Sequence, residues 1–296
     1  MARGSRPADF VDVTTILSIQ SSVAYGHVGN SAATFPLMRM GVEVWPVITV
    51  HFSNNTGYES WRGPLLSADD VREVVRGIDE RGVLAGCDAV LSGYQGAADM
   101  GGAVLDAVAL VRARNPSAVY CCDPVLGDVG RGFFVAPGLP ELMRDTVVPQ
   151  AQVITPNQFE LEFLTGRRTR TLDEVIDAAD AARALGPDTV LVTSVVTDSA
   201  ASGTLDMVAV SGTGAWLVTT PLLSGVFQGA GDLTAAVFLA RLLQSGDVAD
   251  AVGRTASVVY GVLLATARSG RRELQLVAAQ DELVDPTETF HAVQLR

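Results

Sequence analysis

The segment Gly229-Ala230-Gly231-Asp232 combines two features that suit chemistry on an anion. Small residues let the backbone turn tightly and expose its N–H groups, and a helix-forming run over residues 233–240 follows directly. The first turn of a helix leaves N–H groups unpaired and carries partial positive charge, so a phosphate or oxyanion fits there. Asp232 would lie beside that anion as a general base. Aspartate is also a common helix N-cap, and on these four residues alone that structural role is the more frequent one.

The chain contains no lysine, because all 21 residues in its lysine and arginine count are arginine. P-loop nucleotide sites, protein-kinase sites and pyridoxal-phosphate-dependent sites each require a lysine, so these three classes are excluded. If the turn before Asp232 binds phosphate, no lysine can balance the charge, so we expect backbone dipoles and bound cations to contribute.

Length and composition predict a folded protein with a large core. The chain has 296 residues, of which 48% are hydrophobic and 18% charged. We expect a loose N-terminal tail over residues 1–12 and a single domain over residues 13–296. The formal net charge of -12 and the scattered arginines argue against binding to nucleic acid.

Nothing in the sequence predicts a membrane or export signal. No apolar run reaches the roughly 18 to 20 uninterrupted residues that span a bilayer, and residues 1–7 lack the apolar centre of a signal peptide. Cys121 and Cys122 are adjacent in an apolar segment and Cys87 stands alone, a spacing typical of neither a disulfide framework nor a zinc site. We therefore expect a cytoplasmic protein with no membrane partner.

Strand and helix patterns alternate along most of the chain. Apolar, β-branched runs predict strands at residues 15–19, 43–50, 89–92, 118–122, 152–155, 189–193, 207–211 and 215–219. Amphipathic spacing predicts helices at residues 30–40, 68–81, 100–114, 139–145, 172–185, 233–244 and 247–268. The alternation predicts an α/β fold with a mostly parallel sheet between two helical layers, and the last two strands predict an antiparallel hairpin.

Polar and glycine-rich residues follow several of the predicted strands. Ligands of such folds gather outside the carboxyl ends of the strands, so we expect one shared site at that edge. Its contributors are Gln20-Ser21-Ser22, residues 53–57, Gly93-Tyr94, Asp123-Pro124, Thr155-Pro156-Asn157 and the turn at residues 229–232.

From about residue 15 to the end, the chain resembles the pyridoxal kinases of the ribokinase-like superfamily. The segments that carry the resemblance are residues 17–21, 26–33, 52–58, 92–94, 122–128, 154–160, 229–232 and 274–281. The resemblance implies a three-layer ribokinase-like fold that forms a homodimer. It also implies ATP-dependent phosphorylation of the 5′-hydroxymethyl group of pyridoxal to give pyridoxal 5′-phosphate in vitamin B6 salvage. Pyridoxine and pyridoxamine are further candidate substrates.

The resemblance implies roles for the matching residues. Asp232 would take the proton of the substrate hydroxyl as its oxygen attacks the γ-phosphate of ATP. The backbone amides of Gly229, Ala230 and Gly231 would stabilise the transferring phosphoryl group. Mg²⁺ is implied at Asp123 and Glu160, and a monovalent cation, usually potassium, near Asp123, Thr155 and Thr193. Nucleotide contacts are implied at Asp123, Thr155, Asn157, Glu160, Thr193, Pro221, Leu222, Leu223 and Gly231.

The implied substrate pocket offers flat apolar contact and a few fixed hydrogen bonds, as a substituted pyridine ring requires. Its residues are Ser21, Val28, Phe52, Thr56, Tyr94 and Asp232. Residues 127–134 resemble a flap over the nucleotide, with Arg131 as a candidate phosphate contact. His51 stands where the family usually has glutamine, and we assign it no role.

Two alternatives remain open. A hydroxymethylpyrimidine kinase of the same superfamily shares the fold and the base, and the segment at residues 53–58 argues against it. A non-catalytic protein that binds B6 vitamers would keep the pocket without turnover, and the presence of Asp232, Asp123 and Glu160 argues against that. An oxidoreductase fits poorly, because no G-x-G-x-x-G follows the first predicted strand.

Overall fold

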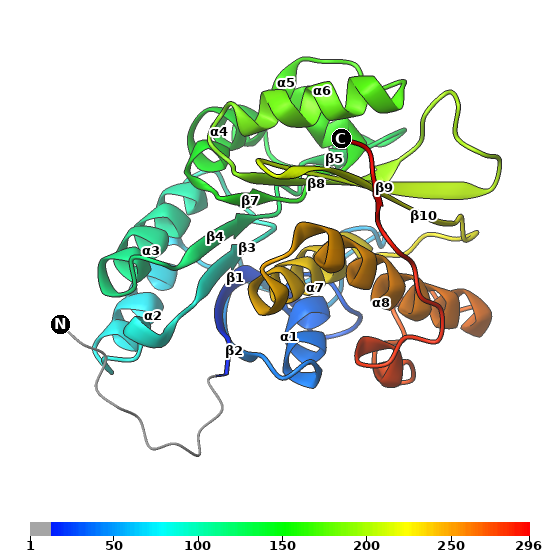
Figure 1. Ribbon diagram of the computed structural model, residues 1–296. Helices are drawn as coiled ribbons and strands as arrows, with labels where there is room; N and C mark the ends of the chain where they lie inside the picture. The colour runs from blue at the N-terminus through cyan, green and yellow to red at the C-terminus, as the bar shows by residue number, and fades with distance from the viewer. Residues whose placement is uncertain (1–12) are drawn as a thin grey trace, which may run out of the picture.

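The protein is built around a nine-stranded sheet (Figure 1). The computed structural model describes residues 13–296, so the expected tail at residues 1–12 lies outside the described residues. Across the sheet the strands are β11 (Val293–Gln294), β10 (Gly214–Pro221), β9 (Thr204–Ser211), β8 (Thr189–Val195), β7 (Val153–Ile154), β4 (Val119–Cys122), β3 (Ala89–Ser92), β1 (Thr15–Val23) and β2 (Glu43–Phe52). Neighbouring strands are parallel from β2 to β8. The carboxyl ends of these strands therefore share one edge.

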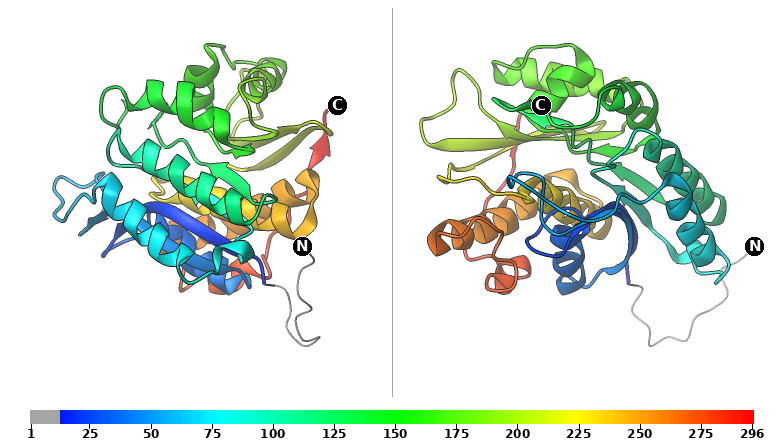
Figure 2. Two further views of the ribbon diagram at one scale, coloured as in Figure 1. Left: turned by 90° about the vertical axis from the view of Figure 1, so that its left-hand side faces the viewer. Right: turned by 180° about the vertical axis from the view of Figure 1, so that it is seen from behind.

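Helices cover both faces of the sheet (Figures 1 and 2). One layer contains α2 (Ala68–Asp79), α3 (Met100–Arg114), α4 (Leu139–Leu142), α5 (Gln158–Thr165) and α6 (Leu172–Arg183), and the other contains α1 (Asn30–Arg39), α7 (Ala230–Ser245) and α8 (Val248–Ser269). Successive strand residues point to opposite faces of the sheet. In β1, Leu17 and Ile19 pack in the core under the first helical layer, and Ile16 packs in the core under the second. The predicted three-layer α/β fold is confirmed.

The predicted hairpin is confirmed and is longer than predicted. β9 and β10 pair antiparallel along their length: Thr204 lies opposite Pro221 at one end and Ser211 opposite Gly214 at the other. Two residues connect the strands. β9 is also antiparallel to β8, and β11 extends the edge by pairing with β10. No strand was predicted at β11, because a two-residue strand leaves no periodic pattern to detect.

Several elements differ from the predicted ones. Helix α5 was not predicted, although it carries a capping box between Asn157 and Glu160. The helix predicted at residues 139–145 is one short turn, α4, followed by a π-helical segment η2 (Met143–Val147) and a 3₁₀ turn η3 (Val148–Gln150). Helix α7 begins at Ala230 rather than at residue 233, so Asp232, the candidate general base, lies inside its first turn.

The remaining elements are small. β5 (Gly127–Asp128) and β6 (Gly132–Phe133) form a two-stranded antiparallel ribbon. The elements η1 (Leu84–Gly86) and η4 (Gln280–Leu283) are single 3₁₀ turns. Among the described residues, α8 is the helix long and apolar enough to cross a membrane by length and composition. Of its most apolar window, 61% is buried inside the protein, as expected for a core helix.

Candidate active site

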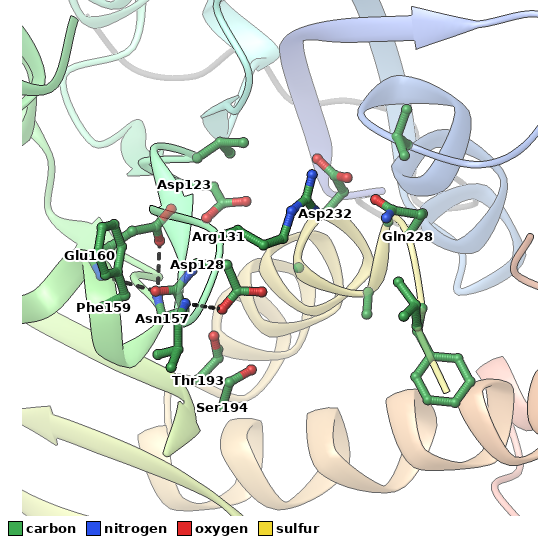
Figure 3. A pocket seen from close by; sticks show the side chains of 18 of the residues that line it. Asp123, Asp128, Arg131, Asn157, Phe159, Glu160, Thr193, Ser194, Gln228 and Asp232 are labelled. Carbon is green, nitrogen blue, oxygen red and sulfur yellow. Dashed lines mark hydrogen bonds between the residues drawn. The ribbon is translucent and has the colours of Figure 1, made fainter. Parts of the chain in front are cut away.

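A cleft of about 1070 Å³ opens at the carboxyl ends of the parallel strands. All of the site residues predicted from the sequence line it: Ser21, Val28, Phe52, Thr56, Tyr94, Asp123, Thr155, Asn157, Glu160, Thr193, Pro221, Leu222, Leu223, Gly229, Ala230, Gly231 and Asp232. Figure 3 shows Asp123, Asn157 and Glu160 on one side of the cleft and Asp232 on the other, with Arg131 extending between them. His51 is exposed and is not among the residues lining the cleft.

The first turn of α7 forms part of the cleft lining. Gly229 is its N-cap with φ 84°, a left-handed conformation that favours glycine. The first N–H to bond within the helix is that of Leu233, which donates to the Gly229 carbonyl at 2.9 Å. The Ala230 N–H donates to the Phe227 carbonyl at 3.3 Å, so the amide of Gly231 is a better-placed donor for an anion.

Asp232 is the third residue of α7, and its side chain is partly buried in the cleft wall. Burial raises the pKa of this carboxyl to about 6, and the backbone N–H groups of Gly29 and Asp232 itself oppose the rise. Gly29 is the N-cap of α1, so the starts of two helices face the same carboxylate. Asp232 is therefore ionised at neutral pH and more basic than an exposed aspartate.

Asp123 follows β4 and is buried. Its Oδ1 accepts a hydrogen bond from the Thr155 hydroxyl at 3.1 Å. Burial, and then the nearby Glu160 and Asp232 carboxylates, raise the pKa of Asp123 well above its ordinary value, and the Thr155 bond opposes this. Both of these carboxylates thus repel the Asp123 carboxylate.

Glu160 joins helix α5 to the loop after β4. Its Oε1 accepts from the N–H groups of Leu126 at 2.6 Å and Gly127 at 3.3 Å, and its Oε2 accepts from the Asn157 N–H at 2.9 Å. Burial raises the pKa of Glu160, and these three N–H donors oppose the rise. Since both oxygens already accept backbone bonds, Glu160 orders the loop as well as contributing negative charge.

The backbone is strained at two positions of the cleft. Val125 has φ 46° and Ser194 has φ 56°, which are unfavourable for residues with a side chain, and most of all for a β-branched one. Both residues line the cleft. The Leu126 and Gly127 bonds to Glu160 hold the Val125 turn in place, an arrangement typical of functional loops.

The charge of the cleft is strongly unbalanced. Five acidic side chains line it, and Arg131 is the single cationic one among the described residues. The acids are Asp123, Asp128, Glu160, Glu162 and Asp232. Arg131 lies in the β5–β6 ribbon, its guanidinium 5.3 Å from the Phe134 ring. The ribbon is anchored by Phe133, which packs edge-on against Phe159 and Phe163 with ring centroids 5.1 and 5.0 Å apart.

The two ends of the cleft differ in character. At one end, Val23, Val50 and Phe52 form a small apolar cluster with Val28 and Tyr94, close to the hydroxyl-bearing Ser21 and Thr56. At the other end, Pro221, Leu222 and Leu223 are joined by residues that were not predicted: Leu205, Met207, Ala256, Val259, Tyr260 and Leu263. The α8 members recur at helical spacing, a pattern that the sequence cannot distinguish from an ordinary core stripe.

Known proteins match this chain over most of its length. A family model described as phosphomethylpyrimidine kinase matches residues 72–276. A pyridoxal kinase PdxY from Rubrobacter xylanophilus is 59% identical over 276 residues, covering 93% of this chain and 95% of the relative. The chain belongs to the pyridoxal kinase family.

Further members of the pyridoxal kinase family support this assignment. The PdxY of Leifsonia xyli subsp. xyli is 56% identical over 93% of this chain and 97% of its own. The solved structure of pyridoxal kinase from Leishmania donovani in complex with ADP and pyridoxine superposes with a TM-score of 0.88 at 30% identity. That match covers 95% of this chain and 99% of the other.

Proposed function

We propose that this chain transfers the γ-phosphoryl group of ATP to the 5′-hydroxymethyl group of pyridoxal, giving pyridoxal 5′-phosphate. The observation that carries the proposal is the position of Asp232. It lies on the first turn of α7, in the same cleft as the apolar cluster with Ser21 and Thr56 and the apolar residues around Pro221. A base in one cleft with two substrate sites is the arrangement that direct phosphoryl transfer to an alcohol requires.

Within this proposal, Asp232 accepts the proton of the substrate hydroxyl as its oxygen attacks phosphorus. A pKa of about 6 keeps the carboxylate ionised at neutral pH, while burial makes it more basic than an exposed aspartate. The amide of Gly231 and the positive end of α7 stabilise the charge that develops on the transferring group.

The cleft suits bound cations. Five acids and one arginine leave a negative excess, and burial makes that excess costly unless a cation balances it. No cluster of three or more histidine, cysteine or acidic side chains that could hold a metal ion is found among residues 13–296. Mg²⁺ suits a cleft with separate carboxylates, because it binds to one or two carboxylates and keeps several waters. When bound, it would neutralise the phosphate oxygens.

Asp123 is better placed than Glu160 to hold Mg²⁺ directly. Among the described residues, its Oδ1 accepts one hydrogen bond, from the Thr155 hydroxyl, and its Oδ2 accepts none. Glu160 would act through water, since both of its oxygens accept backbone bonds. A potassium ion near Asp123, Thr155 and Thr193 remains a prediction from the family resemblance. Homodimer formation and a cytoplasmic location also remain predictions.

A hydroxymethylpyrimidine kinase is the second candidate, because the matching family model carries a related description. That match begins at residue 72, so it leaves out the segment at residues 53–58, from which Asn55, Thr56 and Gly57 line the cleft. The relatives that match 93% of this chain, including that segment, are named pyridoxal kinases. These relatives therefore favour pyridoxal over hydroxymethylpyrimidine as the substrate.

The test is a substrate panel with purified protein, Mg²⁺ and ATP. ADP release and the phosphorylated product are measured with pyridoxal, pyridoxine, pyridoxamine and hydroxymethylpyrimidine. We expect the highest kcat/KM with pyridoxal. Preference for hydroxymethylpyrimidine would assign the second function, and tight pyridoxal binding without ADP release would indicate a non-catalytic binding protein.

A further inference from the structure

Glu273 stands out as a buried acid outside the cleft lining. It follows α8, the residue is 7% exposed, and it does not line the cleft. No ion pair to Glu273 is found among the described residues, so hydrogen-bond donors alone balance its carboxylate. A buried carboxylate is costly unless its lone pairs are occupied, which makes the identity of those donors informative.

Three donors from two separate segments converge on this carboxylate. Its Oε1 accepts from the Tyr58 hydroxyl at 2.8 Å and from the Asn55 amide at 3.2 Å, and its Oε2 accepts from the His27 N–H at 3.1 Å. The Glu273 bond is the largest of the causes that raise the pKa of Tyr58 to about 12, so the phenol stays protonated and remains a donor.

Both segments form the walls of the substrate end of the cleft. Asn55 lies in the segment whose residues 55–57 line the cleft, and His27 directly precedes the lining residue Val28. Arg272 makes two further contacts with this loop. Its guanidinium donates to the Gly57 carbonyl and lies 4.2 Å from the Tyr58 ring centroid. The C-terminal segment therefore holds the loop at residues 55–58 from outside.

Glu273 is also connected to the turn at residues 229–232. The backbones of Glu273 and Gln228 form a parallel bridge immediately before Gly229. The His27 carbonyl lies directly against Gly229, where a β-carbon would be 1.9 Å from the oxygen. None of the hydrogen bonds of the Glu273 side chain reaches the nucleotide end of the cleft.

We infer that Glu273 is a positioning residue, whose carboxylate fixes the loop at residues 55–58 and the backbone at His27 in the relative placement that binds the vitamer. This inference rests on the proposed function, because the affected site is the vitamer half of the same cleft. Losing the carboxylate should loosen the vitamer site and leave the nucleotide site intact.

Glu273→Gln tests this with little change in volume. An amide offers one acceptor oxygen, so its NH₂ group must face either the His27 N–H or the Tyr58 and Asn55 donors. At least one buried donor then loses its partner, and we expect the KM for pyridoxal to rise about tenfold. The KM for ATP should stay within about twofold, because no bond on the nucleotide side is lost.

Tyr58→Phe and Glu282→Gln complete the experiment. The first removes one donor and should raise the KM for pyridoxal less than Glu273→Gln does. The second is a matched control, because Glu282 accepts from the Thr287 N–H at 2.8 Å in the same C-terminal region but does not line the cleft. It should leave both KM values unchanged. Thermal unfolding is measured for every variant.

The outcomes separate the inference from the proposed function. A KM for pyridoxal that rises in Glu273→Gln and Tyr58→Phe, at constant KM for ATP, supports the positioning role. Loss of thermal stability with unchanged KM values would show a purely structural role and overturn it. If Glu273→Gln does not fold, Tyr58→Phe decides, and an unchanged KM for pyridoxal in it overturns the inference. A wild-type protein without activity on pyridoxal contradicts the proposed function instead.

Discussion

Gly229 and His27 are packed so closely that a β-carbon on Gly229 would lie 1.9 Å from the His27 carbonyl oxygen. That glycine also has φ 84°, so both its conformation and its surroundings exclude a side chain. The contact fixes where α7 starts and thereby where Asp232, three residues later, meets the cleft. The start of α7 thus depends on a residue pair far apart in the sequence.

Gly229→Ala should abolish most turnover, because the α7 start must shift to relieve the clash. The matched control is Gly246→Ala at the other end of the same helix, where φ is 67° and no atom lies within 4 Å of an added β-carbon. The control carries the strain of the left-handed conformation alone, roughly 1 kcal/mol. Comparing kcat and thermal unfolding of the two variants checks this. Equal activities would show that the Gly229 contact does not matter.

Arg131 should contribute to nucleotide turnover, because it is the single cationic side chain lining the cleft among residues 13–296. Arg131→Ala is expected to lower kcat/KM for ATP by about tenfold or more, on the scale of a lost charge-stabilising donor. Arg81→Ala, which removes an exposed arginine beside Glu80, serves as the control. Unchanged steady-state kinetics in Arg131→Ala would assign this arginine to the solvated surface.

Much of the site could be predicted because its signals are local. The turn at residues 229–232 and the polar residues after the strands are short segments, and a parallel sheet brings such segments to one edge. Helix α5 could also have been predicted, since Asn157 and Glu160 have the spacing of a capping box. Its eight residues, however, show little of the amphipathic period by which longer helices are recognised.

Other parts of the site had no local signal. The bonds of Glu273 to Tyr58 and His27 span 215 and 246 residues along the chain, so only the fold brings them together. On α8, the cleft-lining residues Val259 and Leu263 have the spacing of any buried stripe. Sequence periodicity predicts that such a face is covered, and cannot tell whether protein or ligand covers it.

The pH dependence of the reaction should report the pKa of Asp232. The ionised form is required, and burial raises this pKa from 3.8 to about 6. The kcat/KM for pyridoxal should therefore fall as the pH decreases through about 6. A solvated aspartate would keep the rate constant down to about pH 4 to 5. A profile that is flat between pH 7 and pH 5 would contradict the assignment.

The same pKa shift predicts a pH-dependent effect on stability. Because the folded-state pKa is raised, protonation stabilises the fold below the unfolded value of 3.8, and this contribution is lost as the pH rises through about 6. Replacing Asp232 by asparagine removes the cost of the buried charge. The Tm gain of Asp232→Asn should therefore be larger at pH 7.5 than at pH 4.5. A gain that does not change with pH would contradict the raised pKa.

The most direct test of the account is the turnover number of Asp232→Asn with pyridoxal and Mg²⁺-ATP, measured together with pyridoxal binding. Asparagine keeps the size of the side chain and cannot accept the proton. We predict that kcat falls by at least about 100-fold while the Kd for pyridoxal changes little. Turnover close to that of the wild type, with binding intact, would show that Asp232 is not the base.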